Sequence, residues 1–159
     1  MKKTAVIYNP KATGMSKLDL DKVKSIFNKR IKADLFESQK AGDTPRLVQK
    51  VNEDYDWIIT MGGDGTMGEA VQALNDVTQR GFYSHIPVGT TNDTANNFGM
   101  RGYDPYTLIK MMTSSGNLRE IDMDALEVNG RAVGYVSACG AFTDITYRTP
   151  RFLKMSLGT

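Results

Sequence analysis

"WIITMGGDGTMGEAVQAL", residues 57–74, places an apolar, strand-like run directly before a cluster of glycines and a helical pattern. Glycine has no side chain, so Gly62, Gly63 and Gly65 leave the backbone open to a close neighbour or a ligand. Asp64 puts a carboxylate in the middle of this gap. The stretch therefore predicts a strand, a loop that something approaches closely, and a helix.

The alternation of strand-like and helix-like segments extends over the first two thirds of the chain. Apolar, β-branched runs predict strands at residues 4–9, 33–38, 56–61 and 84–89. The expected helix starts are Ser16, Thr44 with Pro45 in the first helical position, the end of the glycine loop, and Asp104. Strands that alternate with helices are typical of a parallel sheet. We therefore predict an α/β fold, with a Rossmann-like parallel sheet and flanking helices.

A different pattern follows Leu118. Two strand-like runs flank Asn129 and Gly130, and Asn-Gly is the strongest two-residue signal for a β-hairpin. A hairpin alone is marginally stable in water. We predict that residues 1–119 form an α/β domain, and that residues 120–159 are the truncated beginning of a second, β-sandwich domain.

Composition narrows the class of protein. The net charge of +2 is too small to indicate a nucleic-acid partner. Residues 1–40 carry ten Lys or Arg and four Asp or Glu, which fits either a solvated helix surface or a contact with phosphates or an anionic membrane. The single cysteine, Cys139, excludes an internal disulfide and fits a reducing cytosol. No run approaches the roughly 18 apolar residues of a membrane span, so we expect a cytoplasmic protein for which any membrane contact must be peripheral.

Several glycine-loop chemistries compete at residues 57–74. Gly63, Gly65 and Gly68 match the G-x-G-x-x-G spacing of a dinucleotide site, but the next strand lacks the acidic end residue that such sites use. A Walker A sequence is absent. The single histidine, His85, lies in a strand-like run and is expected to be structural, so a zinc site or a catalytic triad has little support. A tight turn capped by Asp64 or Thr66 stays open as an alternative.

A phosphate cradle is the remaining functional interpretation. A helix N-terminus favours an anion, and glycines let phosphate oxygens reach backbone N–H groups. Asp64 suits such a site only if Mg²⁺ lies between the carboxylate and the phosphates. "PVGTTNDTANNFGM", residues 87–100, repeats the arrangement after the next strand. Carboxyl ends of neighbouring parallel strands form one crevice, so residues 62–66 and 89–93 are predicted to line one cleft.

These two glycine stretches together resemble the diacylglycerol kinase catalytic domain, a family that also includes sphingosine and ceramide kinases. "IYNPKATG", residues 7–14, is similar to the family's opening element, and the segment after Leu118 is similar to the entry into its second domain. The resemblance implies an ATP- and Mg²⁺-dependent transfer of the γ-phosphoryl group to the hydroxyl of a membrane lipid. It also implies peripheral contact at the inner face of the membrane, and a homodimer is an open expectation.

The resemblance also implies roles for individual residues. The expected nucleotide-binding residues are Asn9 with the loop to Gly14, and Gly62, Gly63, Asp64, Gly65, Thr66, Glu69, Gly89, Thr90 and Asn92. The expected catalytic residues are Asp64 and Asp93, and the expected metal-binding residues are Asp64 and Asp122. Lys154 is aligned with a basic residue near the phosphates.

The chain departs from the family pattern at two positions. Gly68 stands where the family often has Asn, and Asn96 stands where it often has an Arg directed at phosphate. The family's general base is expected beyond this chain, so we predict no lipid phosphorylation by these 159 residues alone and self-association after about residue 120. An NAD kinase and a nucleotide-binding module without catalysis are the alternative functions.

Overall fold

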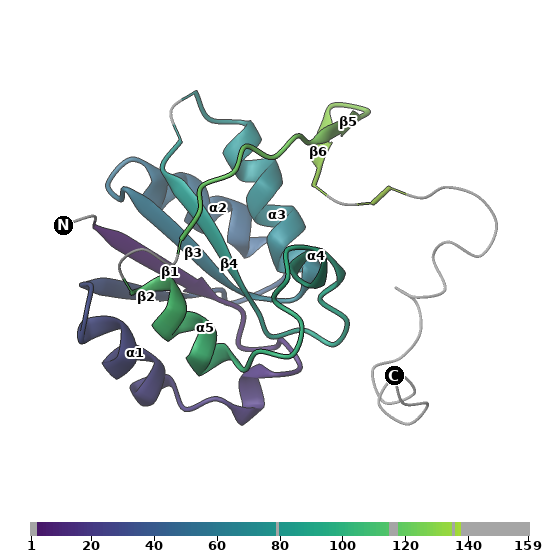
Figure 1. Cartoon of the computed structure of the whole chain (residues 1–159). Coiled ribbons are helices and arrows are strands. Elements are labelled where there is room, and N and C mark those ends of the chain that lie inside the picture. The colour runs from purple at the N-terminus through teal and green to yellow at the C-terminus, as the bar shows by residue number, and fades with distance from the viewer. Residues whose placement is uncertain (1–2, 79, 115–117, 135, 138–159) are drawn as a thin grey trace.

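The computed structural model describes residues 3–78, 80–114, 118–134 and 136–137. Four parallel strands form the central sheet in the order β2-β1-β3-β4 (Figure 1). Their bounds are Thr4–Tyr8 for β1, Ala33–Glu37 for β2, Trp57–Gly62 for β3 and Phe82–Pro87 for β4. The predicted parallel α/β fold is confirmed, and each strand lies within two residues of its expected range.

Helices cover both faces of this sheet (Figure 1). They are α1 at Leu20–Asn28, α2 at Asp43–Asn52, α3 at Asp64–Asn75, α4 at Asp93–Asn97 and α5 at Pro105–Met112, with a 3-10 turn, η1, at Met15–Lys17. Helices α1 and α5 pack on one face, and α2 and α3 pack on the other. All helices of the described residues are too short or too polar to cross a membrane.

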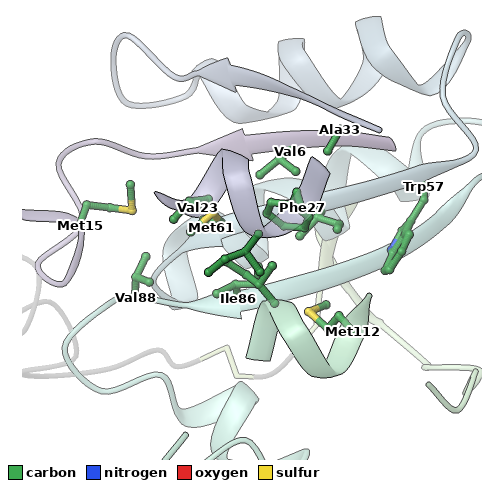
Figure 2. Packing of buried hydrophobic residues seen from close by; sticks show 13 residues of the cluster. Val6, Met15, Val23, Phe27, Ala33, Trp57, Met61, Ile86, Val88 and Met112 are labelled. Atoms are coloured by element: carbon green, nitrogen blue, oxygen red, sulfur yellow. The ribbon is translucent and has the colours of Figure 1, made fainter. Parts of the chain in front are cut away.

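Two apolar clusters hold these layers together. On one face, Phe27 of α1 and Ile109 of α5 pack on Val6, Met61 and their neighbours, as Figure 2 shows for much of the cluster. On the other face, side chains of α2 and α3 pack on β1 and β3. Every residue of β3 is buried, as expected for a strand covered on both faces. Strand β3 therefore carries the glycine loop out of the most constrained part of the core.

Two predicted helix starts are wrong. Ser16 lies in the 3-10 turn, and α1 begins later because the Asp19 side chain accepts hydrogen bonds from the N–H groups of Asp21 and Lys22. Helix α2 begins at Asp43, before the predicted cap Thr44, and Gly42 precedes it with a φ of 78°. Because Gly42 adopts this left-handed conformation, the chain turns into the helix one residue before the predicted cap. The local capping pattern did not reveal this.

The predicted hairpin is confirmed. Strand β5 (Leu126–Val128) pairs antiparallel with β6 (Arg131–Val133), and Asn129 and Gly130 have φ values of 51° and 73°. Positive φ at both positions is the type I′ turn geometry that Asn-Gly favours. The Ala132 N–H donates to Gln72 Oε1 on α3 at 2.6 Å. The expectations for Cys139 and Lys154 lie outside the described residues.

Candidate functional site

The strand order creates a crevice at one edge of the sheet. Strands β1 and β3 are neighbours in the middle of the sheet. After β1 the chain continues to β2 on one side, and after β3 it continues to β4 on the other side, so the two loops diverge. Ligands of open α/β sheets bind at such a switch point, outside the carboxyl ends of the strands. A cavity of about 210 Å³ opens there, lined by Asn9, Lys11, Ala12, Thr13, Gly63, Gly65, Thr66 and Gly89.

This cavity combines three loops that are distant in the sequence. They follow β1, β3 and β4, and the prediction that residues 62–66 and 89–93 share a cleft holds for Gly63 and Gly89. A second hollow, of about 400 Å³, is lined only by the consecutive residues 28–32 before β2. That hollow lies at the opposite edge of the sheet, away from the glycine loops.

Gly63 and Gly89 pack backbone against backbone. A Cβ on Gly89 would lie 2.5 Å from the Gly63 Cα, and a Cβ on Gly63 would lie 3.2 Å from the Gly89 Cα. The side-chain amide of Asn92 holds this second loop, because its Oδ1 accepts from the Gly89 N–H at 2.8 Å and its Nδ2 donates to the Gly89 carbonyl at 3.0 Å. Both glycines are therefore required by contact between the two loops.

Gly65 differs from these two glycines. A Cβ built on Gly65 meets nothing within 4 Å, although Gly65 lines the cavity. The first N–H groups of a helix have no intrahelical acceptor, and no hydrogen bond among the described residues uses those of Gly63, Gly65 or Thr66. These donors at the N-terminus of α3 make this end of the cavity suited to an anion.

Asp64 connects the two glycine loops. Its carboxylate accepts from the backbone N–H of Asp93 at 3.3 Å and from that of Thr94 at 3.2 Å. Helix α4 begins at these residues, and its own N-cap, Asn92, makes no side-chain cap. Asp64 is therefore a cap for the neighbouring helix, whereas the alternative of Asp64 or Thr66 capping α3 is wrong because Gly63 occupies that position.

Polar contacts also fix the loop that follows β1. Asn9 Oδ1 accepts from the Lys11 N–H at 2.9 Å, and Asn9 Nδ2 donates to the Thr66 hydroxyl at 3.4 Å. The hydroxyls of Thr13 and Thr90 lie 3.0 Å apart across the mouth between the first and third loops. The structure thus brings Asn9, Thr66 and Thr90 together around the cavity.

The match to a known family covers this whole arrangement. The family described as "Diacylglycerol kinase catalytic domain" matches residues 3–126, which include the four-stranded sheet and all three cavity loops. The chain belongs to this family. The cavity and its three loops therefore lie within a catalytic domain of the diacylglycerol kinase type.

Two curated relatives carry the name diacylglycerol kinase. The protein from Bacillus subtilis (strain 168) is 32% identical over 163 residues, which cover 99% of this chain and 52% of the relative. The protein from Staphylococcus carnosus (strain TM300) is 30% identical over 162 residues, which cover 99% and 51%. The chain thus spans about half the length of the curated relatives it matches.

Solved structures agree with the family assignment. A crystal structure of a diacylglycerol kinase from Bacillus anthracis strain Sterne superimposes with a TM-score of 0.63 at 27% sequence identity. The superposition covers 70% of this chain and 41% of the other. It confirms the α/β fold predicted from the sequence.

The acidic residues expected in a diacylglycerol kinase site are dispersed. Glu69 Oε1 accepts from the Gly42 N–H at 3.2 Å, so it links α3 to the start of α2. Asp122 is exposed between α5 and β5, and no hydrogen bond among the described residues joins it to the glycine loops. In the described part of the chain, no three His, Cys, Asp or Glu side chains form a group that could hold a metal. Mg²⁺ usually keeps waters and takes only one or two carboxylates beside substrate phosphates, and Asp64 fits that mode.

Sequence reasoning missed the side chains beneath the loop. His85 is buried as predicted, and desolvation lowers its pKa from 6.5 to about 4, against a smaller raising effect of Asp64. Its Nδ1 lies 2.8 Å from the hydroxyl of Thr60, its cross-strand partner. Lys11 and Thr13 also line the cavity, and both lie in the loop from Asn9 to Gly14 that the family resemblance gives as a nucleotide contact. The signal that could have found Thr60 is a polar residue inside an otherwise apolar strand.

Proposed function

We propose that the chain is the nucleotide-binding part of a lipid kinase that transfers the γ-phosphoryl group of ATP to a lipid hydroxyl, with diacylglycerol as the acceptor. The observation that carries this proposal is the cavity at the switch point, where Gly65 contributes no side chain and the first turn of α3 contributes free N–H groups. The family match and the names of the relatives support the reaction class.

The glycine loop would bind the phosphates. The backbone N–H groups of Gly63, Gly65 and Thr66 would donate to phosphate oxygens. Gly63 and Gly89 let the two loops pack closely, and Gly62 leaves room for Thr66. Asn9, Thr90 and Asn92 shape the remaining wall of the nucleotide site. Glu69 supports the far end of the first turn through Gly42. Phosphoryl transfer depends mainly on positioning and charge neutralisation, and this arrangement would supply the positioning.

The metal would be held on the Asp64 side of the cavity. Bound Mg²⁺ neutralises charge on the β- and γ-phosphate oxygens. Asp64 is already fixed in orientation by the N–H groups of Asp93 and Thr94, so its carboxylate can coordinate directly or through water at little entropic cost. Asp122 is proposed as a second carboxylate of this metal network.

The acceptor would approach along α4. Asp93 stands at the first position of α4, next to Asp64, and is proposed as a catalytic residue that orients the lipid hydroxyl. The lipid would come from the inner face of the membrane, which the protein contacts peripherally from the cytoplasm. A homodimer is compatible with the exposed apolar side chains of Leu126 and Val128 in the hairpin.

A transfer assay tests the proposal. The intact gene product is incubated with radiolabelled ATP, Mg²⁺ and vesicles that contain diacylglycerol, phosphatidylglycerol, a sphingoid base or undecaprenol, and a parallel reaction contains NAD in place of the vesicles. We expect label in phosphatidic acid, and loss of that label in Asp64→Asn. Label in NAD phosphate, or nucleotide binding without transfer to any lipid, would refute the lipid kinase.

A further inference from the structure

Three polar side chains of β3 and β4 form a hydrogen-bonded chain that leads from the partly buried Tyr83 to the buried Thr60 and His85. The Tyr83 hydroxyl lies 2.7 Å from the Thr60 hydroxyl, which lies 2.8 Å from His85 Nδ1. Thr60 is fully buried and His85 is 6% exposed. None of the three lines the cavity, so the proposed phosphate contacts leave this buried network unexplained.

The protonation state of His85 decides which group donates and which accepts in each hydrogen bond of the network. Because burial lowers the pKa of His85 to about 4, its imidazole is neutral near pH 7 and has one donor and one acceptor. The Gly62 backbone acts on the ring as a hydrogen-bond acceptor does and raises this pKa, so we assign the ring proton to Nε2. Nδ1 then accepts from Thr60, and Thr60 accepts from Tyr83, whose pKa is raised by burial. Every buried polar side chain of the described residues is satisfied.

The network ends on the residue that begins the glycine loop. The Gly62 carbonyl accepts from the N–H of Val88 at 2.8 Å, and Val88 directly follows β4, the strand that carries His85. In a planar trans peptide, the C=O of one residue and the N–H of the next point in opposite directions. Fixing the Gly62 oxygen therefore fixes the direction of the Gly63 N–H. A Cβ on Gly62 would lie 2.3 Å from the Thr66 hydroxyl oxygen, so this peptide has little room to move.

We propose that Thr60 and His85 are positioning residues for the glycine loop, which act through the Gly62 carbonyl to direct the Gly63 N–H into the cavity. The proposal rests on the function proposed above, because the Gly63 N–H is one of the donors assigned to phosphate. It adds that the loop is set by hydrogen bonds from the strands beneath it, and not by the glycines alone. Tyr83 supports Thr60 from the far side.

The decisive variants change one hydroxyl. Thr60→Val keeps the shape of the side chain but removes its hydrogen bonds, and Thr60→Ser restores the hydroxyl. Ser84→Ala is the matched control, because Ser84 accepts from Trp57 Nε1 at 3.0 Å on the same pair of strands but away from the loop. Each variant is measured for unfolding by urea, for binding of MgATP by calorimetry, and for the Gly63 amide resonance in a ¹⁵N–¹H spectrum.

We expect Thr60→Val to shift the Gly63 amide resonance and to weaken MgATP binding about tenfold, the effect of one hydrogen bond to a charged group. Thr60→Ser should restore both readouts. Ser84→Ala should lose comparable stability while the Gly63 resonance and the affinity stay unchanged. This contrast separates positioning from general weakening of the β3–β4 pair.

Two results would overturn the proposal. One is a folded Thr60→Val chain whose Gly63 resonance and MgATP affinity equal those of the unchanged chain, and the other is an equal effect in Ser84→Ala. If Thr60→Val does not fold, Tyr83→Phe decides, because it removes only the outer hydroxyl and should still move the Gly63 resonance. If the unchanged chain binds no MgATP, the proposed function fails, while the resonance still decides whether Thr60 sets the Gly63 peptide.

Discussion

Replacing Gly65 by alanine should change stability and binding in opposite directions. Gly65 lies in the first turn of α3, its φ is not in the left-handed region, and a Cβ would meet nothing within 4 Å. Alanine is favoured over glycine in a helix by roughly 0.5–1 kcal/mol. Gly65→Ala should therefore raise the free energy of unfolding by up to about that amount.

The same methyl group should obstruct the ligand. It would occupy the part of the cavity where a phosphate oxygen must come within about 3 Å of the backbone N–H groups. Losing one hydrogen bond to a charged group costs about 1.5–3 kcal/mol, which corresponds to a roughly 10- to 100-fold weaker affinity. We expect MgATP binding by Gly65→Ala to fall within that range.

Gly68→Ala is the matched control for this experiment. Gly68 also lies in α3, a Cβ there also meets nothing within 4 Å, and Gly68 does not line the cavity. It should gain similar stability with unchanged MgATP affinity. Urea unfolding and calorimetric titration measure the two quantities. A Gly65→Ala chain that binds MgATP normally would show that the open space beside Gly65 does not hold phosphate.

Three further predictions concern neighbouring residues. Asp64→Asn keeps one of the two oxygens that accept from the α4 N–H groups and removes the charge, so in titrations it should lose more affinity for MgATP than for ATP with a chelator; equal losses would indicate a cap alone. Gly89→Ala should destabilise the chain by about 1–3 kcal/mol in urea unfolding, because its Cβ would lie 2.5 Å from the Gly63 Cα; unchanged stability would refute this packing. Because the folded pKa of His85 is about 4 and its usual value is 6.5, the unfolded chain binds the extra proton between these values, and stability should fall by about 2 kcal/mol from pH 7 to pH 5. His85→Gln should remove that loss, and an unchanged slope would contradict it.

Local patterns were sufficient for the sheet and the hairpin. Strand β3 is apolar at almost every position because both faces are covered, and Asn129-Gly130 meets the need for two positive φ values. The predicted start of α1 was wrong because two possible N-caps, Ser16 and Asp19, lie within one turn of each other, and Asp19 is the one that accepts the first N–H groups of the helix. The short helix α4 was not foreseen, because its cap comes from Asp64, about thirty residues earlier in the chain.

The glycines show the limit of sequence reasoning about the site. Gly63 and Gly65 occur in one motif and were given one reason, an open backbone for a ligand. Gly63 meets Gly89 of another loop, whereas nothing within 4 Å faces a Cβ on Gly65. A glycine needed for packing and one left for a ligand look identical in a sequence. Only the register of β3 with β4, which brings the two loops together, separates them.

Helix α3 connects the cavity to the second sheet. Its first turn carries Asp64 and Gly65, and two turns later Gln72 accepts from the Ala132 N–H at 2.6 Å. A helix of this length is a stiff element, and its N-terminal position is also fixed from below through Gly62. The glycine loop is held by the segment after β4 through the hydrogen bond from the Val88 N–H to the Gly62 carbonyl, and by the next loop through Gly89, so the directions of its N–H groups do not depend on glycine flexibility.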